Sequence, residues 1–278
     1  MAYIPVDWRN SLRKECRRRR HSERTAETYI HCIEKFFAYN NKTIDKASKK
    51  DVKEYLTQLS EKGLSGSTLN VNHMALRFLF QEVLNKKIRI DIKYSKTPKR
   101  LPEYLTKEEV KRLLGKITNW KHKLMIEMLY GSGIRVSELI NMKIKDLVLN
   151  EGYGYVRNGK GGKDRIIVLP RIVTEKIKNL KEIEGLEEED YLFISNRKKK
   201  YSVRSIQQII KKAARKAGIK KRVHPHTMRH SYATHLIERN HGINEVQALL
   251  GHKSPETTMI YIHGNKGRMI NIKSPLEE

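Results

Sequence analysis

The sequence predicts a mainly α (α+β) protein: an N-terminal helical domain and a larger, mostly helical domain with a small antiparallel β-sheet. Three observations support this. Apolar residues recur at helical spacing through the first ninety residues, a polar and basic segment with two prolines follows at 91–102, and a strand-like pattern occurs only after about residue 150. A chain of 278 residues also suggests about two domains. We therefore expect domains over 1–90 and 103–278, joined by a basic linker over 91–102.

The helices expected in the N-terminal domain follow residues that can cap a helix. Thr25 can cap a segment whose apolar residues recur at helical spacing, and Ser48 precedes a second segment that ends at Gly63. Ser65 and Ser67 precede a third, longer helical segment. Because none of these segments alternates as a half-buried strand does, we expect a small helical bundle.

The second domain is expected to begin with helices. Thr106 and Glu109 form a capping-box signature, and a helix near 121–130 ends at the glycine turn 131–133. A short helix follows from Val136.

Strands are expected next. Residues 152–170 predict a hairpin, because glycines occupy its loop and β-branched residues follow, and 191–195 (YLFIS) is a candidate third strand. The remaining helices are expected at 203–217, 227–240, 243–250 and 257–262.

The chain is strongly basic, with 58 Lys and Arg against 31 Asp and Glu and a formal net charge of +27. Such an excess is typical of proteins that bind a polyanion, most often nucleic acid, although a solvated lysine-rich surface is the other interpretation. The candidate DNA-binding residues are Arg17, Arg18, Arg19, Arg20, Lys96, Lys99, Arg100 and Lys163.

The sequence disfavours several classes of protein. No apolar stretch approaches the ~20 residues of a membrane span, and the first residues contain no apolar secretory segment. Cys16 and Cys32 have no metal-like spacing and give no disulfide framework. We therefore expect no association with a membrane and a cytoplasmic location.

Cations that could hold a phosphodiester occur in two separate segments. Arg135 follows a glycine turn in GSGIRVSEL, and Arg229 lies one helical turn after His226 in HTMRH. A phosphodiester under attack accumulates charge on its non-bridging oxygens, which preorganised cations stabilise. Arginine suits this role because its planar fork donates two parallel hydrogen bonds. Any single arginine in so basic a chain is more often surface charge.

Groups that could attack and transfer protons lie near these arginines in the sequence. Lys160 lies in the glycine-rich GKGGKDR, where a lysine can protonate a leaving alkoxide, and Lys163 competes for that role. His252 follows Gly251 in LGHKS, and Tyr261 follows in TTMIYIH. Taken singly, such a histidine is more often structural, and most tyrosines pack in cores.

A zinc site is not expected. His226 and His230 form an H-x-x-x-H pair, but no glutamate lies between them and no third ligand is evident. We expect neither a metal nor another cofactor.

Five motifs occur in the order GSGIRVSEL, GKGGKDR, HTMRH, LGHKS and TTMIYIH. Their joint pattern resembles the tyrosine recombinase (phage-type integrase) superfamily and is most similar to its Xer-type and integron-type members. The resemblance covers roughly 103–265 and extends more loosely to the N-terminal helices. It implies a SAM-like core-binding domain over 1–90 that binds DNA, and a catalytic domain with a short C-terminal tail over 103–278.

The resemblance also implies individual roles. Tyr261 would be the nucleophile and form a 3′-phosphotyrosyl bond, Lys160 would protonate the 5′-oxygen, and Glu138 would orient its neighbours. The implied catalytic residues are Arg135, Lys160, His226, Arg229, His252 and Tyr261, with Glu138 in support.

The resulting prediction is a site-specific recombinase that acts on double-stranded DNA as a homotetramer. It would resolve chromosome dimers or integrate and excise a mobile element. The nearest alternative is a type IB topoisomerase-like enzyme, which nicks and reseals one strand as a monomer. A catalytically silent DNA-binding protein on the same scaffold is the alternative from another class, and the motifs disfavour a basic RNA- or ribosome-associated protein.

Overall fold

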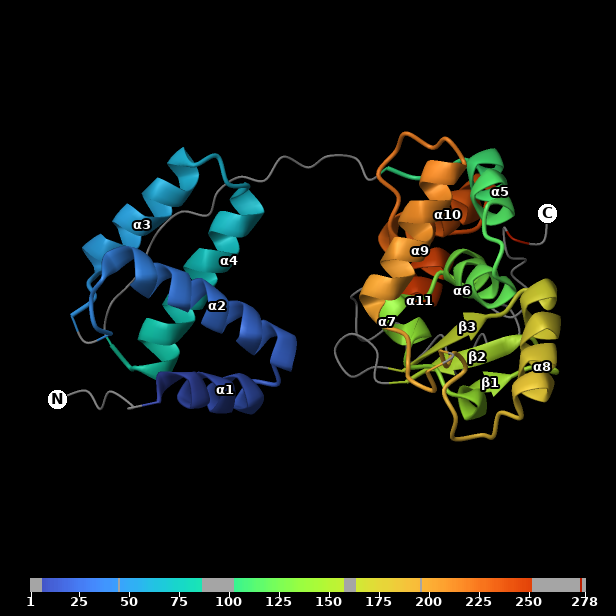
Figure 1. Cartoon of the computed structure of the whole chain (residues 1–278), viewed down its shortest axis with the longest axis horizontal. Coiled ribbons are helices and arrows are strands. Elements are labelled where there is room, and N and C mark those ends of the chain that lie inside the picture. Colours follow the sequence, from blue (N-terminus) through green and yellow to red (C-terminus); the bar gives the residue numbers. More distant parts are fainter. Residues whose placement is uncertain are drawn as a thin grey trace. The chain divides into compact units, whose positions relative to one another are not determined.

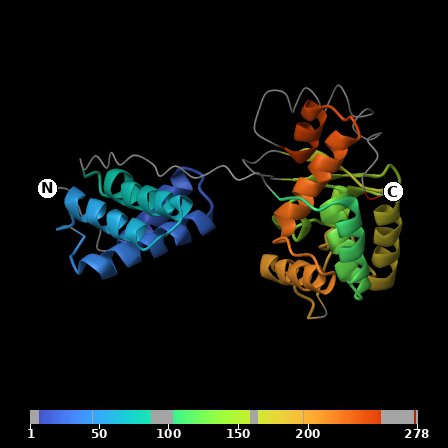
Figure 2. The same ribbon diagram turned by 90° about the horizontal axis from the view of Figure 1, so that it is seen from above.

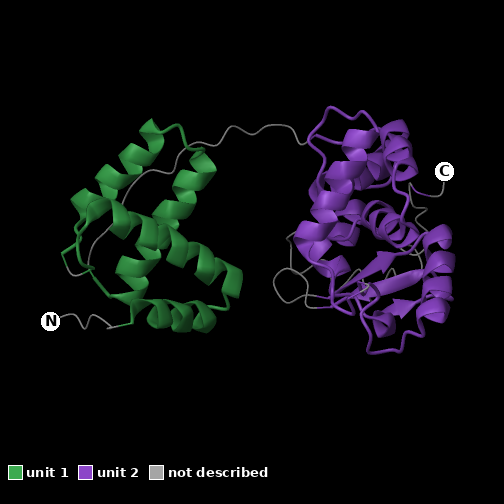
Figure 3. Cartoon of the chain, in the orientation of Figure 1, with its two compact units in different colours: residues 1–100 green, residues 101–278 purple. Residues whose placement is uncertain are grey.

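The structure, a computed structural model, describes residues 7–44, 46–86, 103–157, 164–195, 197–251 and 276. The chain divides into two compact units, residues 1–100 and 101–278 (Figure 3). The described residues of both are mainly helical, and those of the second include a small antiparallel sheet, which confirms the predicted mainly α (α+β) class. None of the described helices combines the length and the apolar character that a membrane crossing requires.

Unit 1 is a bundle of helices. Its elements are α1 (Trp8–Arg18), α2 (Glu23–Asn40), α3 (Lys49–Glu61), α4 (Gly66–Arg77) and the π-helix η1 (Phe78–Val83) (Figure 1). α2 packs against α1, α3 and α4. Ile33, Phe36 and Leu79 are fully buried in the core between these helices, so the unit has an apolar core of its own.

Side-chain caps determine where the helices of unit 1 begin. Ser48 caps α3 and Ser65 caps α4, as their positions predict. The expected start of α2 is wrong: Ser22 is the N-cap, and its hydroxyl accepts a hydrogen bond of 3.1 Å from the Thr25 backbone N–H. Thr25 therefore lies inside the first turn, together with Glu23, whose charge is favourable at a helix N-terminus.

Unit 2 is built around α6 (Trp120–Gly131), in which every residue from Leu124 to Gly131 is buried. A helix that is buried on all sides lies inside a domain rather than on its surface. The helices that contact α6 are α5 (Lys107–Gly115), α7 (Val136–Leu139), α8 (Arg171–Glu184), α9 (Val203–Lys216) and α10 (Pro225–Glu238). Thr106 and Glu109 form the predicted capping box at the start of α5.

The sheet of unit 2 has the order β1-β2-β3, with β1 (Leu147–Val148), β2 (Tyr153–Val156) and β3 (Arg165–Val168). The predicted hairpin is confirmed, since β2 and β3 are antiparallel and Val156 lies opposite Arg165. The predicted strand 191–195 is wrong: Tyr191 and Ile194 form only isolated bridges. Leu192 and Phe193 are both buried in the core, so this apolar run anchors an irregular segment.

The remaining helices follow the sequence closely, with one omission. α8 was not predicted, and Figures 1 and 2 show it beside α6. α11 (Ile243–Leu250) matches its predicted range, and α9 ends one residue before its predicted end. α10 begins two residues early, because His224 caps it and proline suits the first position of a helix. The helix expected at 257–262 lies outside the described residues.

Candidate active site

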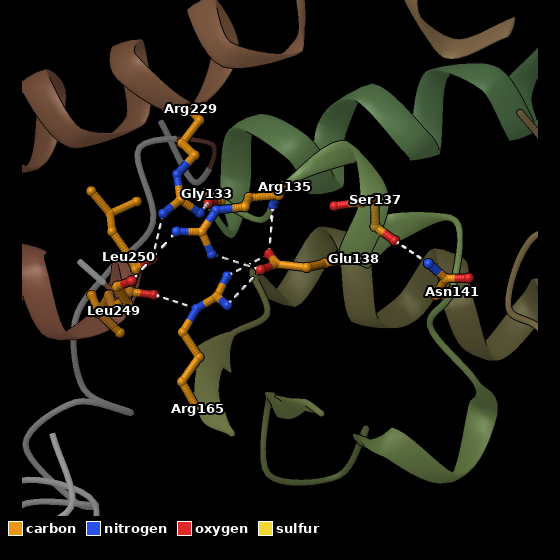
Figure 4. Close-up of polar contacts among 10 residues, drawn as sticks. Gly133, Arg135, Ser137, Glu138, Asn141, Arg165, Arg229, Leu249 and Leu250 are labelled. Atoms are coloured by element: carbon orange, nitrogen blue, oxygen red, sulfur yellow. Dashed lines mark hydrogen bonds and ion pairs between the residues drawn. The ribbon is translucent and has the colours of Figure 1, made fainter. Parts of the chain in front are cut away.

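Arg135 is placed by a tight turn between α6 and α7. Gly133 in this turn has φ +59, and a Cβ there would collide with the ring of Tyr232 from α10. Only glycine meets both requirements. Arg135 is the N-cap of α7: its backbone N–H donates to Glu138 Oε2 (2.7 Å), and its Nη1 donates to Glu138 Oε1 (2.8 Å) (Figure 4). Arg135 is therefore held in place by Glu138, three residues later, at the start of the same helix.

Arg165, at the start of β3, is a third arginine of the site, and the sequence interpretation missed it. Its Nη1 donates to Glu138 Oε1 (2.8 Å) and its Nη2 to Glu138 Oε2 (2.6 Å). Only 5% of its side chain is exposed. Arg165 and Arg135 thus share one carboxylate, as Figure 4 shows.

The C-terminus of α11 lies against all three arginines. The consecutive carbonyl oxygens of Leu249, Leu250 and Gly251 accept from Arg165 Nε (3.1 Å), Arg229 Nη2 and Arg135 Nη2 (3.4 Å), respectively. The last carbonyls of a helix have no partner within the helix and carry its negative dipole end, so they suit cationic donors. The arginines therefore fix the turn that directly precedes residue 252.

Arg229 extends from α10 into the interior. It is 5% exposed, and its Nη1 donates to the Gly133 carbonyl (2.6 Å). Burial first, and then the charges of Arg135 and Arg165, lower the pKa of its guanidinium. Arginine nevertheless keeps its proton in proteins, so the site holds a charge that its surroundings disfavour. A bound anion would relieve that cost.

Among the residues that the structure describes, Glu138 is the carboxylate that pairs with this cluster. Burial alone would raise its pKa, but hydrogen bonds and attraction from Arg165, and hydrogen bonds from Arg135, outweigh burial and lower the pKa to about 2. Glu138 is therefore ionised at neutral pH. Three guanidiniums against one carboxylate leave an excess of positive charge around α7, β3 and the end of α11, which favours an anionic ligand such as a phosphate.

The other predicted site residues lie outside this buried cluster or outside the described part of the chain. His226 is exposed on α10, one turn before the buried Arg229, and its ring centroid lies 6.1 Å from that of His224. The predicted residues that lie outside the described part of the chain are Lys96, Lys99, Arg100, Lys160, Lys163, His252 and Tyr261. The structure does place the segments beside some of them, since β2 and β3 flank 158–163 and α11 ends at Leu250.

The arginine cluster at the end of α1 is partly neutralised within unit 1. Arg18 and Arg19 both pair with Glu15 (2.7 and 2.6 Å), and Arg19 also pairs with Glu82. Arg17 lies 3.8 Å from Glu23 and has a 71% exposed side chain. Arg17 is thus the most loosely paired of these three arginines, with a side chain as exposed as that of Arg18.

No group of three metal-ligating side chains occurs among the described residues. This finding concerns only those residues, since His252 lies outside them.

Comparison with known proteins gives one consistent result. Residues 103–268 match the phage integrase family, and residues 8–90 match the N-terminal SAM-like domain of phage integrases. The chain is 40% identical over 246 residues to the tyrosine recombinase XerA of Pyrococcus furiosus, covering 86% of this chain and 83% of that protein.

Two solved structures show the same relationship. A crystal structure of XerA recombinase is 30% identical, with a TM-score of 0.52 and 94% of each chain covered. The XerH site-specific recombinase bound to its palindromic difH substrate is 26% identical, with a TM-score of 0.69, covering 94% of this chain and 82% of that one.

Proposed function

Because the chain belongs to the phage integrase family and is a Xer-like tyrosine recombinase, we propose that it cuts and rejoins duplex DNA through a 3′-phosphotyrosyl intermediate on Tyr261. The observation that carries this proposal is the convergence of Arg135, Arg165 and Arg229 on the end of α11, where Arg135 and Arg165 also share the Glu138 carboxylate. This excess of buried positive charge suits a phosphodiester, and residue 252 follows that helix end directly.

The proposed reaction balances without a metal or another reactant. The Tyr261 oxygen attacks phosphorus, the P–O5′ bond breaks, and Arg135 and Arg229 stabilise the charge that develops on the non-bridging oxygens. The phenolic proton passes to a histidine, either His226 or His252, and Lys160 supplies a proton to the 5′-oxygen. A 5′-hydroxyl from a second strand then attacks the phosphotyrosine: it loses its proton to the general base, a new P–O5′ bond forms, the bond between phosphorus and the Tyr261 oxygen breaks, and the phenolate regains a proton. The number of phosphodiester bonds is therefore conserved.

The proposed partner is double-stranded DNA carrying a specific site. XerH, a structural neighbour, is bound to a palindromic DNA substrate, and palindromic sites match symmetric assemblies of protomers. We propose that four protomers assemble on DNA in the cytoplasm and exchange two pairs of strands.

The experiment that tests this function first identifies the DNA site, which the sequence does not reveal. The purified chain is incubated with sheared DNA from its source organism, and fragments that stay attached to protein in detergent are sequenced. We expect enrichment of a short inverted repeat. Two copies of that repeat on one plasmid should then yield deletion or inversion products. Relaxation of supercoils without such products would instead support a topoisomerase, and the absence of any detergent-stable adduct would support a silent DNA-binding protein.

Lys160→Ala should cleave ordinary DNA slowly but recover on DNA whose 5′-bridging oxygen is replaced by sulfur. A thiolate leaves without a proton, so the substrate no longer needs a general acid, which typically contributes about 10²–10⁴-fold. The rate of adduct formation on matched oxygen and sulfur substrates gives the measurement. Lys163→Ala is the matched variant from the same loop, and selective recovery in that variant would transfer the role to Lys163.

DNA affinity should fall steeply with salt. Each phosphate contact contributes a slope of about −0.9 to the plot of log affinity against log salt concentration. Arg17→Gln should make this slope shallower by about one contact, since Arg17 is exposed and only loosely paired. Arg171→Gln, which removes an 88% exposed arginine on α8, is the matched control and should leave the slope unchanged. Equal slopes for the wild type and Arg17→Gln would remove Arg17 from the DNA-binding surface.

A further inference from the structure

Arg165 joins three segments that are distant in sequence. It extends from β3, binds Glu138 of α7 through two parallel hydrogen bonds of 2.8 and 2.6 Å, and donates from Nε to the Leu249 carbonyl of α11 at 3.1 Å. The side chain is buried. Arg165 is therefore not one of the many solvent-exposed cations of this basic chain, because its charge is buried and bound to both a carboxylate and a backbone carbonyl.

We propose that Arg165 is a positioning residue of the recombination reaction, an inference that rests on the proposed function. Arg165 holds the Glu138 carboxylate and the last turn of α11. The same carboxylate accepts hydrogen bonds from the backbone N–H and the Nη1 of Arg135, and so holds Arg135 in place. Arg165 thereby sets the orientation of a guanidinium that binds the scissile phosphate, without itself contacting the DNA.

The packing around Arg165 supports this role. Gly251 has φ +62, and a Cβ there would lie 2.8 Å from Arg165 Cδ, so the chain approaches the arginine stem as closely as glycine allows. Residue 252 comes next in the chain. On the other side, Arg165 starts β3 directly after the loop that contains Lys160. One side chain therefore lies between the segments that lead to both of these proposed catalytic residues.

The contacts also explain why this position requires arginine. Nη1 and Nη2 match the two oxygens of Glu138, while Nε serves a carbonyl on another helix. Lysine would retain the charge, but its single ammonium group cannot reproduce the planar fork. Arg165→Lys should therefore preserve the ionisation of Glu138 better than it preserves the orientation of Arg135.

Removal of Arg165 should expose a pH dependence that the wild type lacks. The groups around Glu138 are Arg135 from its own helix cap, Arg165 from β3 and Arg229 from α10, while Tyr232 lies beside the latter two, with its pKa raised by burial. Loss of Arg165 removes its hydrogen bonds to Glu138 and its attraction, so the pKa of this buried carboxyl rises from its low value. A protonated Glu138 holds Arg135 less firmly, so cleavage should fall as the pH decreases through that raised pKa.

The test uses full-length protein and a nicked duplex carrying the captured site. Arg165→Met, Arg165→Lys and the exposed-arginine control Arg171→Met are compared in single-turnover cleavage at saturating DNA, across pH and below the unfolding temperature of each variant. We expect Arg165→Met to cleave about 10- to 100-fold more slowly than wild type, the scale seen when groups that orient metal ligands are removed. DNA affinity should change little. Its pH profile should show an additional loss of rate on the acid side, which the wild type lacks.

Two further variants separate a positioning role of Arg165 from a purely structural one. The double variant Arg165→Met/Glu138→Gln should lack the new acid limb, because its amide cannot ionise, and Arg165→Lys should restore the pH profile more than the rate. A wild-type pH profile in Arg165→Met, with the loss confined to thermal stability, would reduce Arg165 to a structural residue. Failure of wild-type protein to form any adduct would instead overturn the proposed function.

Discussion

Tyr261→Phe should abolish covalent capture of DNA. Only the phenolic oxygen is lost, so no group remains at this position to attack phosphorus, whereas the arginines that hold the phosphate are unchanged. We expect no detergent-stable adduct on a nicked duplex, in which wild-type protein becomes trapped because the short cleaved strand diffuses away. Non-covalent affinity for the intact site, measured in parallel, should stay close to that of the wild type.

The control for this substitution is another tyrosine. Tyr39→Phe removes a hydroxyl from a 44% exposed ring in α2, distant in sequence from the proposed chemistry, and should leave adduct formation unchanged. An undiminished adduct in Tyr261→Phe would assign the nucleophile to a different residue, which peptide mapping of the trapped adduct would identify.

Much of the fold could be predicted because its signals are local. The capping box of α5 and the range of α11 follow from neighbouring residues, and the β2–β3 hairpin follows from glycine and β-branched residues in order. Elements that depend on tertiary contacts were harder. β1 has only two residues, too few to show a period, whereas 191–195 has the composition of a strand but lies as an irregular segment in the core.

The same division applies to the candidate site. Arg135, Glu138 and Arg229 could be selected from motifs and spacing, and the described structure brings them together. Arg165 was missed because one arginine among 58 Lys and Arg gives no signal by itself. The position of Arg165 nevertheless contained a signal, because Arg165 directly precedes the apolar run IIVL. A charged residue at the edge of a fully buried strand requires a partner. The backbone carbonyls of 249–251 carry no sequence signal at all.

Arg229→Ala should slow cleavage by about 2.7–4 kcal/mol of activation free energy, on the order of 10²–10³-fold, the cost of removing one donor that stabilises a developing oxyanion. Arg135→Ala should cost a similar amount. The measurement is single-turnover adduct formation at saturating DNA, so that weaker binding does not enter the rate. Arg171→Ala, an exposed arginine on α8, provides the control.

Arg229→Lys separates charge from geometry. Arg229 is buried and already donates to Gly133 and Leu250 from two different nitrogens. Lysine would keep a positive charge there, but burial disfavours a charged ammonium, and its single nitrogen cannot replace the planar fork. We therefore expect only partial recovery relative to Arg229→Ala. Full recovery with lysine at both 135 and 229 would mean that positive charge alone suffices, and that the geometry fixed by Gly133, Glu138 and the end of α11 does not control the rate.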